Sequence, residues 1–265
     1  MISKYASIHP EAKIGSNVHI EPFTTVYRDV EIGDGTWIGS GVTIMDGARI
    51  GKKCKIFPGA VISAIPQDLK YAGEKTTAHI GDSTTIREYV TINKGTKALG
   101  KTEVGSHCLL MAYVHIAHDC LIGNHCILAN GVTLAGHIVI DDYAVIGGLS
   151  AVHQFVHIGG HVMISGGSLI RKDVPPYTKA AREPLCYMGI NSVGLRRRGF
   201  ESEKINEIQE IYRMLFLKGF SYSHAIAKIE TELPPSSERD EIIRFFRNSS
   251  RGIMKGYFTS AEERL

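Results

Sequence analysis

The chain has 265 residues, of which 43% are hydrophobic and 22% are charged, and its formal net charge is +3. This composition is typical of a soluble protein with one large domain or two smaller ones. The small net charge gives no indication of nucleic-acid binding, and no DNA- or RNA-binding motif accompanies it. The N-terminus lacks the apolar core of a signal peptide, and no run approaches the roughly 18 apolar residues of a membrane span. We therefore expect a cytoplasmic protein without a membrane span.

Aliphatic residues recur every six positions through the first two thirds of the chain. From Ile8 to Ile170, 25 of the 28 positions in this series are Ile, Val or Leu. The residue two places before each is usually small or β-branched, so both positions should face inward. A period of six fits neither an α-helix nor an alternating strand, and it indicates a β-helix solenoid. Four cysteines occupy the small inward position, where we expect compact hydrophobic residues and no disulfide or zinc site: Cys54, Cys108, Cys120 and Cys126.

The three exceptions to the series are Asp68, Glu74 and Ala98. They predict two loops, near 65–79 and 94–103, that leave corners of the solenoid without shifting the phase of six. Near residue 177 the series ends, because Pro175 and Pro176 cannot donate to a strand ladder.

Beyond the solenoid, apolar residues at helical spacing predict helices over 202–217, 221–233 and 236–249. We expect these helices to cover an end or side of the solenoid, whose unpaired strand edges would otherwise promote aggregation. The predicted organisation is therefore a β-helix over 1–177 with two loop insertions, followed by a small α-helical C-terminal domain over 178–265.

The tandem hexads resemble the left-handed parallel β-helix of the bacterial hexapeptide acyltransferases. In that family three hexads form one triangular coil, so residues three hexads apart stack about 4.8 Å from each other. Beyond the second loop, this spacing brings three columns to one corner: Ala117, Ala135 and His153; His118, Gly136 and Gln154; and Asp119, His137 and Phe155. A separate column is expected to be a solvated edge ladder: His107, His125, Tyr143 and His161.

The polar corner fits direct acyl transfer to an alcohol. His118 can serve as a general base near neutral pH, and Asp119 can fix its tautomer and stabilise the imidazolium. The backbone N–H of Gly136 can donate to the oxyanion of a tetrahedral intermediate. A covalent nucleophile is disfavoured, since Cys120 faces inward and no serine of the cluster has a histidine neighbour. The alternative is that outward histidines only decorate the surface, which applies most to His115 and His153.

Six strings, in this order, resemble the UDP-N-acetylglucosamine O-acyltransferase family of lipid A biosynthesis: QDLKYAGE (67–74), HIAHDC (115–120), ILANGVTLAGH (127–137), AVHQF (151–155), DVPPY (173–177) and GLRRRGF (194–200). The resemblance implies transfer of a 3-hydroxyacyl group from acyl carrier protein to the glucosamine 3-hydroxyl of UDP-N-acetylglucosamine. It also implies a homotrimer with sites between subunits, and neither a metal nor a cofactor of the enzyme's own.

The resemblance also assigns residues. His118, Asp119 and Gly136 correspond to the base, its partner and the oxyanion donor. Asp68, Lys70 and His115 are expected to hold the sugar, with Gln67 beside them. The residues expected to meet the nucleotide diphosphate or the phosphopantetheine arm are Asn191, Arg197, Arg198, His153 and Gln154, and His137 is a further expected substrate-binding residue. One position departs from the family, which often has an acidic residue where Val193 stands. The resemblance leaves open whether the acceptor sugar carries a 3-hydroxyl or a 3-amine.

The acyl chain is expected to run along later coils, and the segment 161–168 is the expected place where its length is set. His161 and Met163 can close such a groove, whereas Gly166 leaves it open.

Three other functions compete with this interpretation. A hexapeptide-repeat carbonic anhydrase would use zinc on His115, His118 and His137; the N-acyltransferase of the same pathway carries an extra N-terminal domain; a purely structural solenoid does not explain the polar corner.

Overall fold

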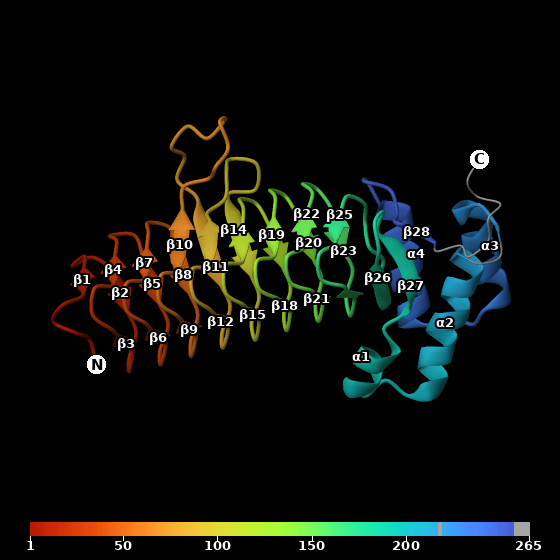
Figure 1. Cartoon of the computed structure of the whole chain (residues 1–265), viewed down its shortest axis with the longest axis horizontal. Coiled ribbons are helices and arrows are strands. Elements are labelled where there is room, and N and C mark those ends of the chain that lie inside the picture. The colour runs from red at the N-terminus through yellow and green to blue at the C-terminus, as the bar shows by residue number, and fades with distance from the viewer. Residues whose placement is uncertain (217–218, 257–265) are drawn as a thin grey trace.

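The computed structural model describes residues 1–216 and 219–256. A parallel β-helix forms the long part of the molecule, and a group of helices lies at its C-terminal end (Figure 1). The strands stack into three sheets, called here sheets one, two and three. Sheet one consists, in spatial order, of β1 (Ser7–Ile8), β4 (Thr25–Val26), β7 (Thr43–Ile44), β10 (Val61–Ala64), β13 (Thr91–Asn93), β16 (His115–Ile116), β19 (Thr133–Leu134), β22 (Ala151–Val152) and β25 (Leu169–Ile170).

Sheet two consists of β2 (Lys13–Ile14), β5 (Glu31–Ile32), β8 (Ala48–Ile50), β11 (Thr77–Ile80), β14 (Lys101–Val104), β17 (Leu121–Ile122), β20 (Val139–Ile140) and β23 (His157–Ile158). Sheet three consists of β3 (His19–Ile20), β6 (Trp37–Ile38), β9 (Lys55–Ile56), β12 (Thr85–Ile86), β15 (Leu109–Leu110), β18 (Ile127–Leu128), β21 (Val145–Ile146), β24 (Met163–Ile164), β26 (Thr178–Ala181), β27 (Cys186–Ile190) and β28 (Lys255–Gly256).

The register gives the coil length directly. Thr25 pairs with Thr43, and His115 pairs with Thr133, so an uninterrupted coil has the length of three hexads. Two coils are longer, because Val61 pairs with Thr91, and Thr91 pairs with His115. The first is longer by two hexads and the second by one, and the extra residues lie in loops 65–76 and 94–100, each between a strand of sheet one and a strand of sheet two. Both loops therefore leave the same corner, and both preserve the phase of six.

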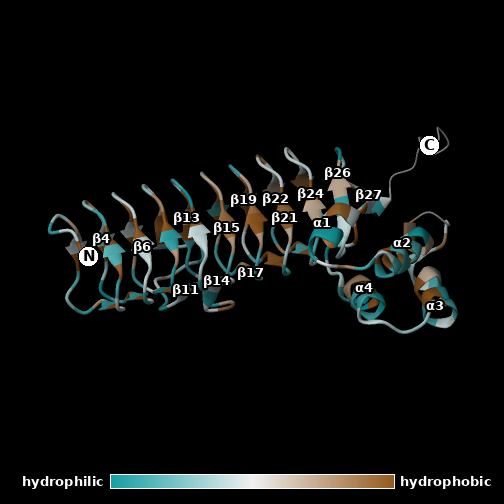
Figure 2. Ribbon diagram, turned by 90° about the horizontal axis from the view of Figure 1, so that it is seen from below, coloured by the Kyte–Doolittle hydropathy of each residue, from teal (hydrophilic) through white to brown (hydrophobic). Residues whose placement is uncertain are grey.

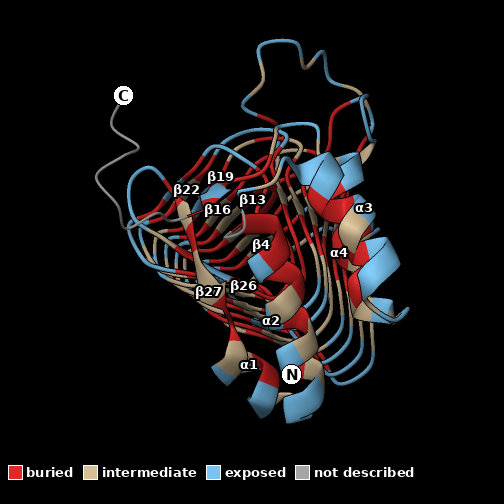
Figure 3. Ribbon diagram, turned by 90° about the vertical axis from the view of Figure 1, so that its right-hand side faces the viewer, coloured by how far each residue is buried: buried red, intermediate tan, exposed pale blue. Residues whose placement is uncertain are grey.

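The interior of the solenoid is filled by the six-residue series. Ile38, Ile56 and Leu128 are among its fully buried members, and Figure 3 shows buried residues along the inside of every coil. Each such side chain contributes up to roughly 1.5–3 kcal/mol by leaving water. The predicted inward cysteines are all buried free thiols, which agrees with their expected role as small hydrophobic residues.

The strand ladder continues past the two prolines, which the sequence did not predict. Pro175 and Pro176 lie in the connection before β26, so they occupy no ladder position, and β26 still pairs in parallel with β24. The spacing is shorter there than in the preceding coils, because Met163 pairs with Lys179. β27 then pairs antiparallel with β26, and β28 pairs in parallel with β27. The segment after residue 177 thus combines strands with helices.

Four helices follow: α1 (Ser192–Arg197), α2 (Ser202–Phe216), α3 (Tyr222–Glu232) and α4 (Ser237–Asn248). The last three agree with the predicted helices within one or two residues at each end, except that Leu217 lies outside the described residues. Their hydrophobic faces pack inward (Figure 2). The short α1 was missed; its signal was Asn191, whose side chain accepts a hydrogen bond from Gly194 N at 3.2 Å. In the described parts of the chain, no helix is long and apolar enough to cross a membrane.

Polar contacts join the last coil to the C-terminal segment. The buried Asp173 carboxylate accepts hydrogen bonds from His157 N at 2.8 Å and from Ser249 Oγ at 2.6 Å. The Tyr212 hydroxyl of α2 donates to Pro176 O at 2.6 Å. Since a buried polar group without a partner is costly, these bonds fix how the C-terminal segment covers the solenoid.

Candidate active site

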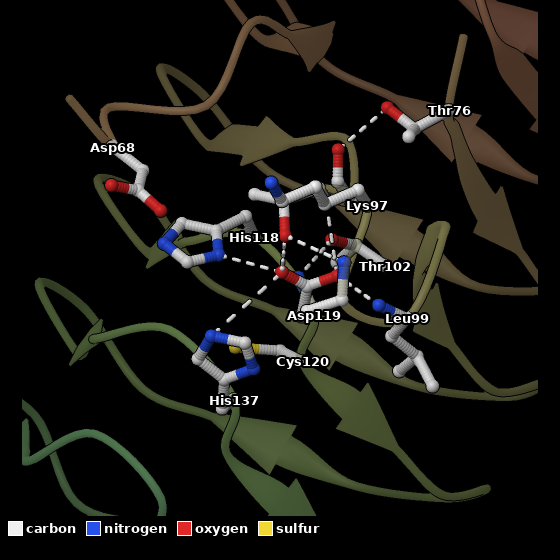
Figure 4. Close-up of polar contacts among 12 residues, drawn as sticks. Asp68, Thr76, Lys97, Leu99, Thr102, His118, Asp119, Cys120 and His137 are labelled. Atoms are coloured by element: carbon white, nitrogen blue, oxygen red, sulfur yellow. Dashed lines mark hydrogen bonds and ion pairs between the residues drawn. The ribbon is translucent and has the colours of Figure 1, made fainter. Parts of the chain in front are cut away.

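His118 and Asp119 form a hydrogen-bonded pair at the corner between sheets one and two, called here the His118 corner. The distance from His118 Nδ1 to Asp119 Oδ2 is 2.8 Å (Figure 4). The His118 side chain is 13% exposed, whereas that of Asp119 is wholly buried. Asp119 turns the corner with a φ of 58°, in the left-handed region that aspartate tolerates better than most residues.

Loop 94–100 covers Asp119 and supplies most of its hydrogen bonds. Thr96 N and Leu99 N donate to Oδ1 at 3.0 and 3.2 Å, and Thr96 Oγ1 donates to Oδ2 at 2.7 Å. Burial acts to raise the pKa of Asp119, but the hydrogen bonds from Thr96 and His118 outweigh it and hold that pKa below its ordinary value. Asp119 is therefore ionised at neutral pH. The phase of the repeat predicts this side chain outside the coil, but it does not show that the second loop folds over the side chain and buries it.

Gly136 lies against the imidazole of His118, as the stacking of successive coils predicts. A Cβ on Gly136 would lie 2.6 Å from His118 Cε1 and 2.8 Å from its Nε2, so glycine leaves room for the ring. The neighbouring backbone N–H groups of Ala135 and His137 donate to Val152 O and His118 O, both at 3.1 Å. Among the described residues, the N–H of Gly136 donates to no acceptor. It is free to donate to a ligand.

The other histidines of the cluster have different surroundings. His137 stands edge-on to His118, with ring centroids 5.1 Å apart, and stacks on Phe155 at 4.6 Å. His115 Nδ1 lies 2.7 Å from Thr91 Oγ1, and burial lowers the pKa of His115. These contacts fix the His137 ring beside His118 and the His115 ring against Thr91.

The donor atoms of His118, Asp119 and His137 lie within 4.8 Å of one another. A tetrahedral zinc ion about 2.0–2.2 Å from each donor would need them roughly 3.4 Å apart. His137 Nε2 is 3.9 Å from Asp119 Oδ2, while His118 Nδ1 already bonds to that oxygen. His115, the third ligand of the zinc hypothesis, is turned to Thr91. Among the described residues of one chain, His115, His118 and His137 therefore do not form a ligand group.

Comparisons with known proteins decide the family. A model described as bacterial transferase hexapeptide (six repeats) matches residues 29–64 and 101–136, and one described as UDP N-acetylglucosamine O-acyltransferase, domain 2, matches residues 173–254. An Acyl-(acyl-carrier-protein)–UDP-N-acetylglucosamine O-acyltransferase from Myxococcus xanthus is 46% identical over 197 residues, 74% of this chain and 76% of the relative. The chain belongs to the UDP-N-acetylglucosamine O-acyltransferase family.

Solved structures of this family agree. A UDP-N-acetylglucosamine acyltransferase from Bacteroides fragilis has a TM-score of 0.95 at 54% identity, covering 96% of this chain and 100% of that chain. The corresponding structure from Acinetobacter baumannii has a TM-score of 0.93 at 41% identity, covering 96% and 99%. The protein is thus an acyltransferase with a left-handed β-helix and a small helical C-terminal part, and the resemblance inferred from the hexads and the six strings is confirmed.

Loop 65–76 carries the acyltransferase residues predicted to hold the sugar. Gln67 and Lys70 are exposed, and Lys70 N donates to Asp68 Oδ1 at 2.9 Å. Figure 4 shows the Asp68 carboxylate beside the edge of His118 that faces away from Asp119. Glu74 ties this loop to the next, since its Oε1 accepts from Lys97 N at 3.1 Å and its Oε2 from Ala72 N at 2.8 Å. The sequence marked Glu74 only as an exception to the six-residue series and did not predict this contact between the loops.

The predicted nucleotide or pantetheine residues divide between two corners. His153 and Gln154 lie on the coil after Gly136 at the His118 corner, where His153 Nδ1 is 3.3 Å from an Arg251 guanidinium nitrogen. Asn191 and Arg198 lie at the corner between sheets two and three. Asn191 donates to His161 O at 2.9 Å, and Arg198 donates to Tyr143 O at 3.0 Å. Arg197 and Val193 are exposed on α1.

The column expected to be a solvated edge ladder is a continuous stack of rings at this second corner. Its centroids are 4.7–4.9 Å apart, and the stack extends by a further 5.5 Å to Tyr177; its members are His107, His125, Tyr143, His161 and Tyr177. Burial, with the charge of Arg198, lowers the pKa of His161 to about 4. His161 is therefore a neutral ring in a stack.

The three residues predicted for the acyl groove do not meet His118 within one chain. His161 lies at the corner between sheets two and three, and Met163 lies on β24 in sheet three. Gly166 lies at the remaining corner, between sheets three and one, where an added Cβ would be 3.0 Å from Gly148 O. Within one chain, these three residues therefore lie away from the His118 corner.

Proposed function

We propose that this acyltransferase transfers a 3-hydroxyacyl group from acyl carrier protein to the glucosamine 3-hydroxyl of UDP-N-acetylglucosamine, the first step of lipid A biosynthesis. The names of its relatives support these substrates. One observation carries the mechanism: His118 Nδ1 lies 2.8 Å from the buried carboxylate of Asp119. Because that carboxylate is an acceptor, Nδ1 carries the proton and Nε2 is free to accept another as a general base.

In the proposed reaction, His118 Nε2 takes the proton of the sugar hydroxyl while the hydroxyl oxygen attacks the thioester carbonyl. A C–O bond forms, and the negative oxygen of the tetrahedral intermediate accepts a hydrogen bond from Gly136 N–H. When the intermediate collapses, the C–S bond breaks and the departing thiolate takes the proton from His118. Protons and electrons balance without a metal or a cofactor of the enzyme's own.

We place the acyl chain between two copies of the protein in a homotrimer. Sheet three carries a column of outward apolar side chains: Leu109, Ile127, Val145 and Met163. Sheet one carries a mostly apolar groove of about 480 Å³ beside the His118 corner, lined in part by His115, Ala135, Val152 and Leu169. Sheet three of one copy facing this groove on another would enclose the chain and bring Met163 and Gly166 near His118.

The same arrangement supports the remaining assignments. Gln67, Asp68 and Lys70, with His115 and His137, would hold the sugar. Residues for the nucleotide diphosphate or the phosphopantetheine arm would come from two copies: His153 and Gln154 from one, and Asn191, Arg197 and Arg198 from another, with guanidinium groups suited to phosphate oxygens. Val193 offers the uracil no acceptor. A 3-amino sugar could also give its proton to the same base. Both proposed substrates are soluble, which supports the expected cytoplasmic location.

A transfer assay tests the proposal. Purified protein is given UDP-N-acetylglucosamine, or its 3-amino analogue, with a ladder of 3-hydroxyacyl carrier proteins. His118→Ala should lower turnover by a factor on the order of 10² to 10⁴, the usual contribution of a general base. Its melting temperature should stay close to that of the parent. Near-parental turnover by His118→Ala would remove the base from the proposal, and transfer to neither acceptor would remove the substrates.

A further inference from the structure

Loop 94–100 is more than a cover for the site. We infer that Thr96 is a positioning residue, whose hydroxyl fixes the carboxylate of Asp119 and through it the ring of His118. The inference rests on the proposed role of His118 as the base. It concerns a residue that would not touch the substrate, since Thr96 is buried behind Asp119.

The Asp119 carboxylate has a defined partner at every position. Thr96 N and Leu99 N bind Oδ1, so that oxygen is fully used inside the loop. Oδ2 accepts from Thr96 Oγ1 at 2.7 Å and from His118 Nδ1 at 2.8 Å. With two bonds to each oxygen the carboxylate cannot rotate, and a single lone-pair direction remains for His118.

Among the described residues, Asp119 Oδ2 is the acceptor of the Thr96 hydroxyl proton. Ala98 N donates to Thr96 Oγ1 at 3.2 Å, and this bond occupies a lone pair of the hydroxyl oxygen. The hydroxyl must therefore donate to Asp119 Oδ2, 2.7 Å away. A hydroxyl that accepts from the backbone of its own loop and donates to Asp119 links the position of the carboxylate to the fold of the loop.

The loop itself is held in place at both ends. Gly95 N donates to Thr77 O at 3.1 Å, and Gly100 N donates to Thr96 O at 2.7 Å. At Gly95 a Cβ would lie 2.3 Å from Lys101 N, so only glycine allows the two ends of the loop to approach this closely. Thr96 is thus carried by a closed, hydrogen-bonded turn and not by a free loop.

This arrangement predicts what Thr96 contributes to the reaction. A general base must direct its lone pair at the proton it removes, and small misplacements lower the rate steeply. The hydrogen bond from the Thr96 hydroxyl fixes the position of Asp119 Oδ2. Oδ2 in turn accepts from His118 Nδ1–H and so fixes the orientation of the ring, including its Nε2 lone pair. Removing the hydroxyl should therefore reduce kcat and leave the KM for the sugar nucleotide nearly unchanged.

Thr96→Val and Thr96→Ser provide the test, with Thr84→Val as a matched control. Thr84 is also buried; its hydroxyl donates to Gly105 O at 2.7 Å and accepts from Cys108 N at 3.1 Å, far from the His118 corner. Thr96→Val should lower kcat about tenfold, equivalent to roughly 1.4 kcal/mol, while Thr96→Ser recovers most of the loss. Thr84→Val should match Thr96→Val in lost melting temperature but keep the parental kcat.

Each outcome bears on one claim. Equal kcat values for Thr96→Val and Thr84→Val, or no recovery in Thr96→Ser, would overturn the positioning role. In a His118→Ala background, Thr96→Val should cost nothing further, since its effect passes through the ring; an additional tenfold loss there would also overturn it. If His118→Ala alone retains activity, the proposed base fails, and that result is distinct from either of the others.

Discussion

The two insertions of this acyltransferase leave the same corner on successive coils, yet they differ in almost every physical respect. Loop 65–76 is the longer one and exposes Gln67 and Lys70 to solvent. Loop 94–100 is shorter, buries Thr96 and directs its backbone N–H groups to Asp119. A long exposed loop is suited to contact a ligand. A short loop whose N–H groups are hydrogen-bonded to a carboxylate is suited to stabilise that buried charge. The comparison predicts that changes in the second loop act on kcat and stability, and changes in the first on KM.

The largest effect is expected at the carboxylate that the second loop holds. Asp119→Asn places an NH₂ group among N–H and O–H donors, leaving at least one of them unpaired, at a cost of roughly 1–3 kcal/mol in unfolding free energy. It also removes the acceptor that sets the His118 tautomer, and an analogous substitution in a serine protease lowers turnover by about 10⁴. Turnover and thermal melting measure both losses; parental values in either would contradict the role of loop 94–100.

The stabilising effect of Asp119 is expected to depend on pH, and Asp119→Asn tests this. The pKa of Asp119 is below its ordinary value in the folded protein, so its ionisation stabilises the fold above the unfolded value of about 3.9. That contribution is lost as the pH falls through the folded value. The difference in melting temperature between parent and Asp119→Asn should therefore be constant from pH 7 to 5 and shrink below about pH 4. A difference that grows in acid would show that the charge of Asp119 does not stabilise the fold.

An intermediate effect is expected in the first loop. Lys70 is exposed and holds nothing in the fold through its side chain among the described residues, so Lys70→Ala should change unfolding free energy by less than about 0.5 kcal/mol. Loss of the proposed charge-assisted hydrogen bond to the sugar nucleotide should raise its KM by about 10- to 100-fold. Lys255→Ala, an exposed lysine on β28, serves as the control. If Lys70→Ala lowers kcat and keeps the parental KM, the first loop does not act on substrate binding as predicted.

The smallest effect is expected at Glu74, which joins the two loops. Glu74→Gln keeps the shape but leaves one acceptor oxygen for two N–H donors, Ala72 N and Lys97 N. One loop is released from the other, and the KM for the acceptor should rise about threefold to tenfold with kcat within a factor of about two. Glu183→Gln, whose carboxylate pairs with Arg171 at the surface, is the matched control. Identical kinetics for the two variants would show that the loops act independently.

Much of the solenoid could be predicted because the repeat assigns each sequence position to a strand, a corner or the interior of a coil. The period of six gave the inward positions, and the stacking of three-hexad coils put Gly136 against His118, as observed. The same spacing could have shown that both insertions leave the His118 corner. Their internal contacts could not be predicted, since Thr96 lies in a loop that follows no repeat and still reaches Asp119 on the next coil. The strands beyond Pro176 escaped notice because β26 keeps its place in the ladder at a spacing shorter than three hexads.

Asp173 has a consequence for how the chain is made. Its carboxylate binds Ser249, 76 residues later, and its backbone carbonyl accepts from Met254 N at 3.0 Å. During synthesis the final coil is therefore complete long before the residues that clasp it leave the ribosome. In that interval β26 and β27 lack β28, and an open strand edge invites pairing with another chain. The helices follow the solenoid in the sequence and return to its end, so the residues that close it emerge only after the whole solenoid.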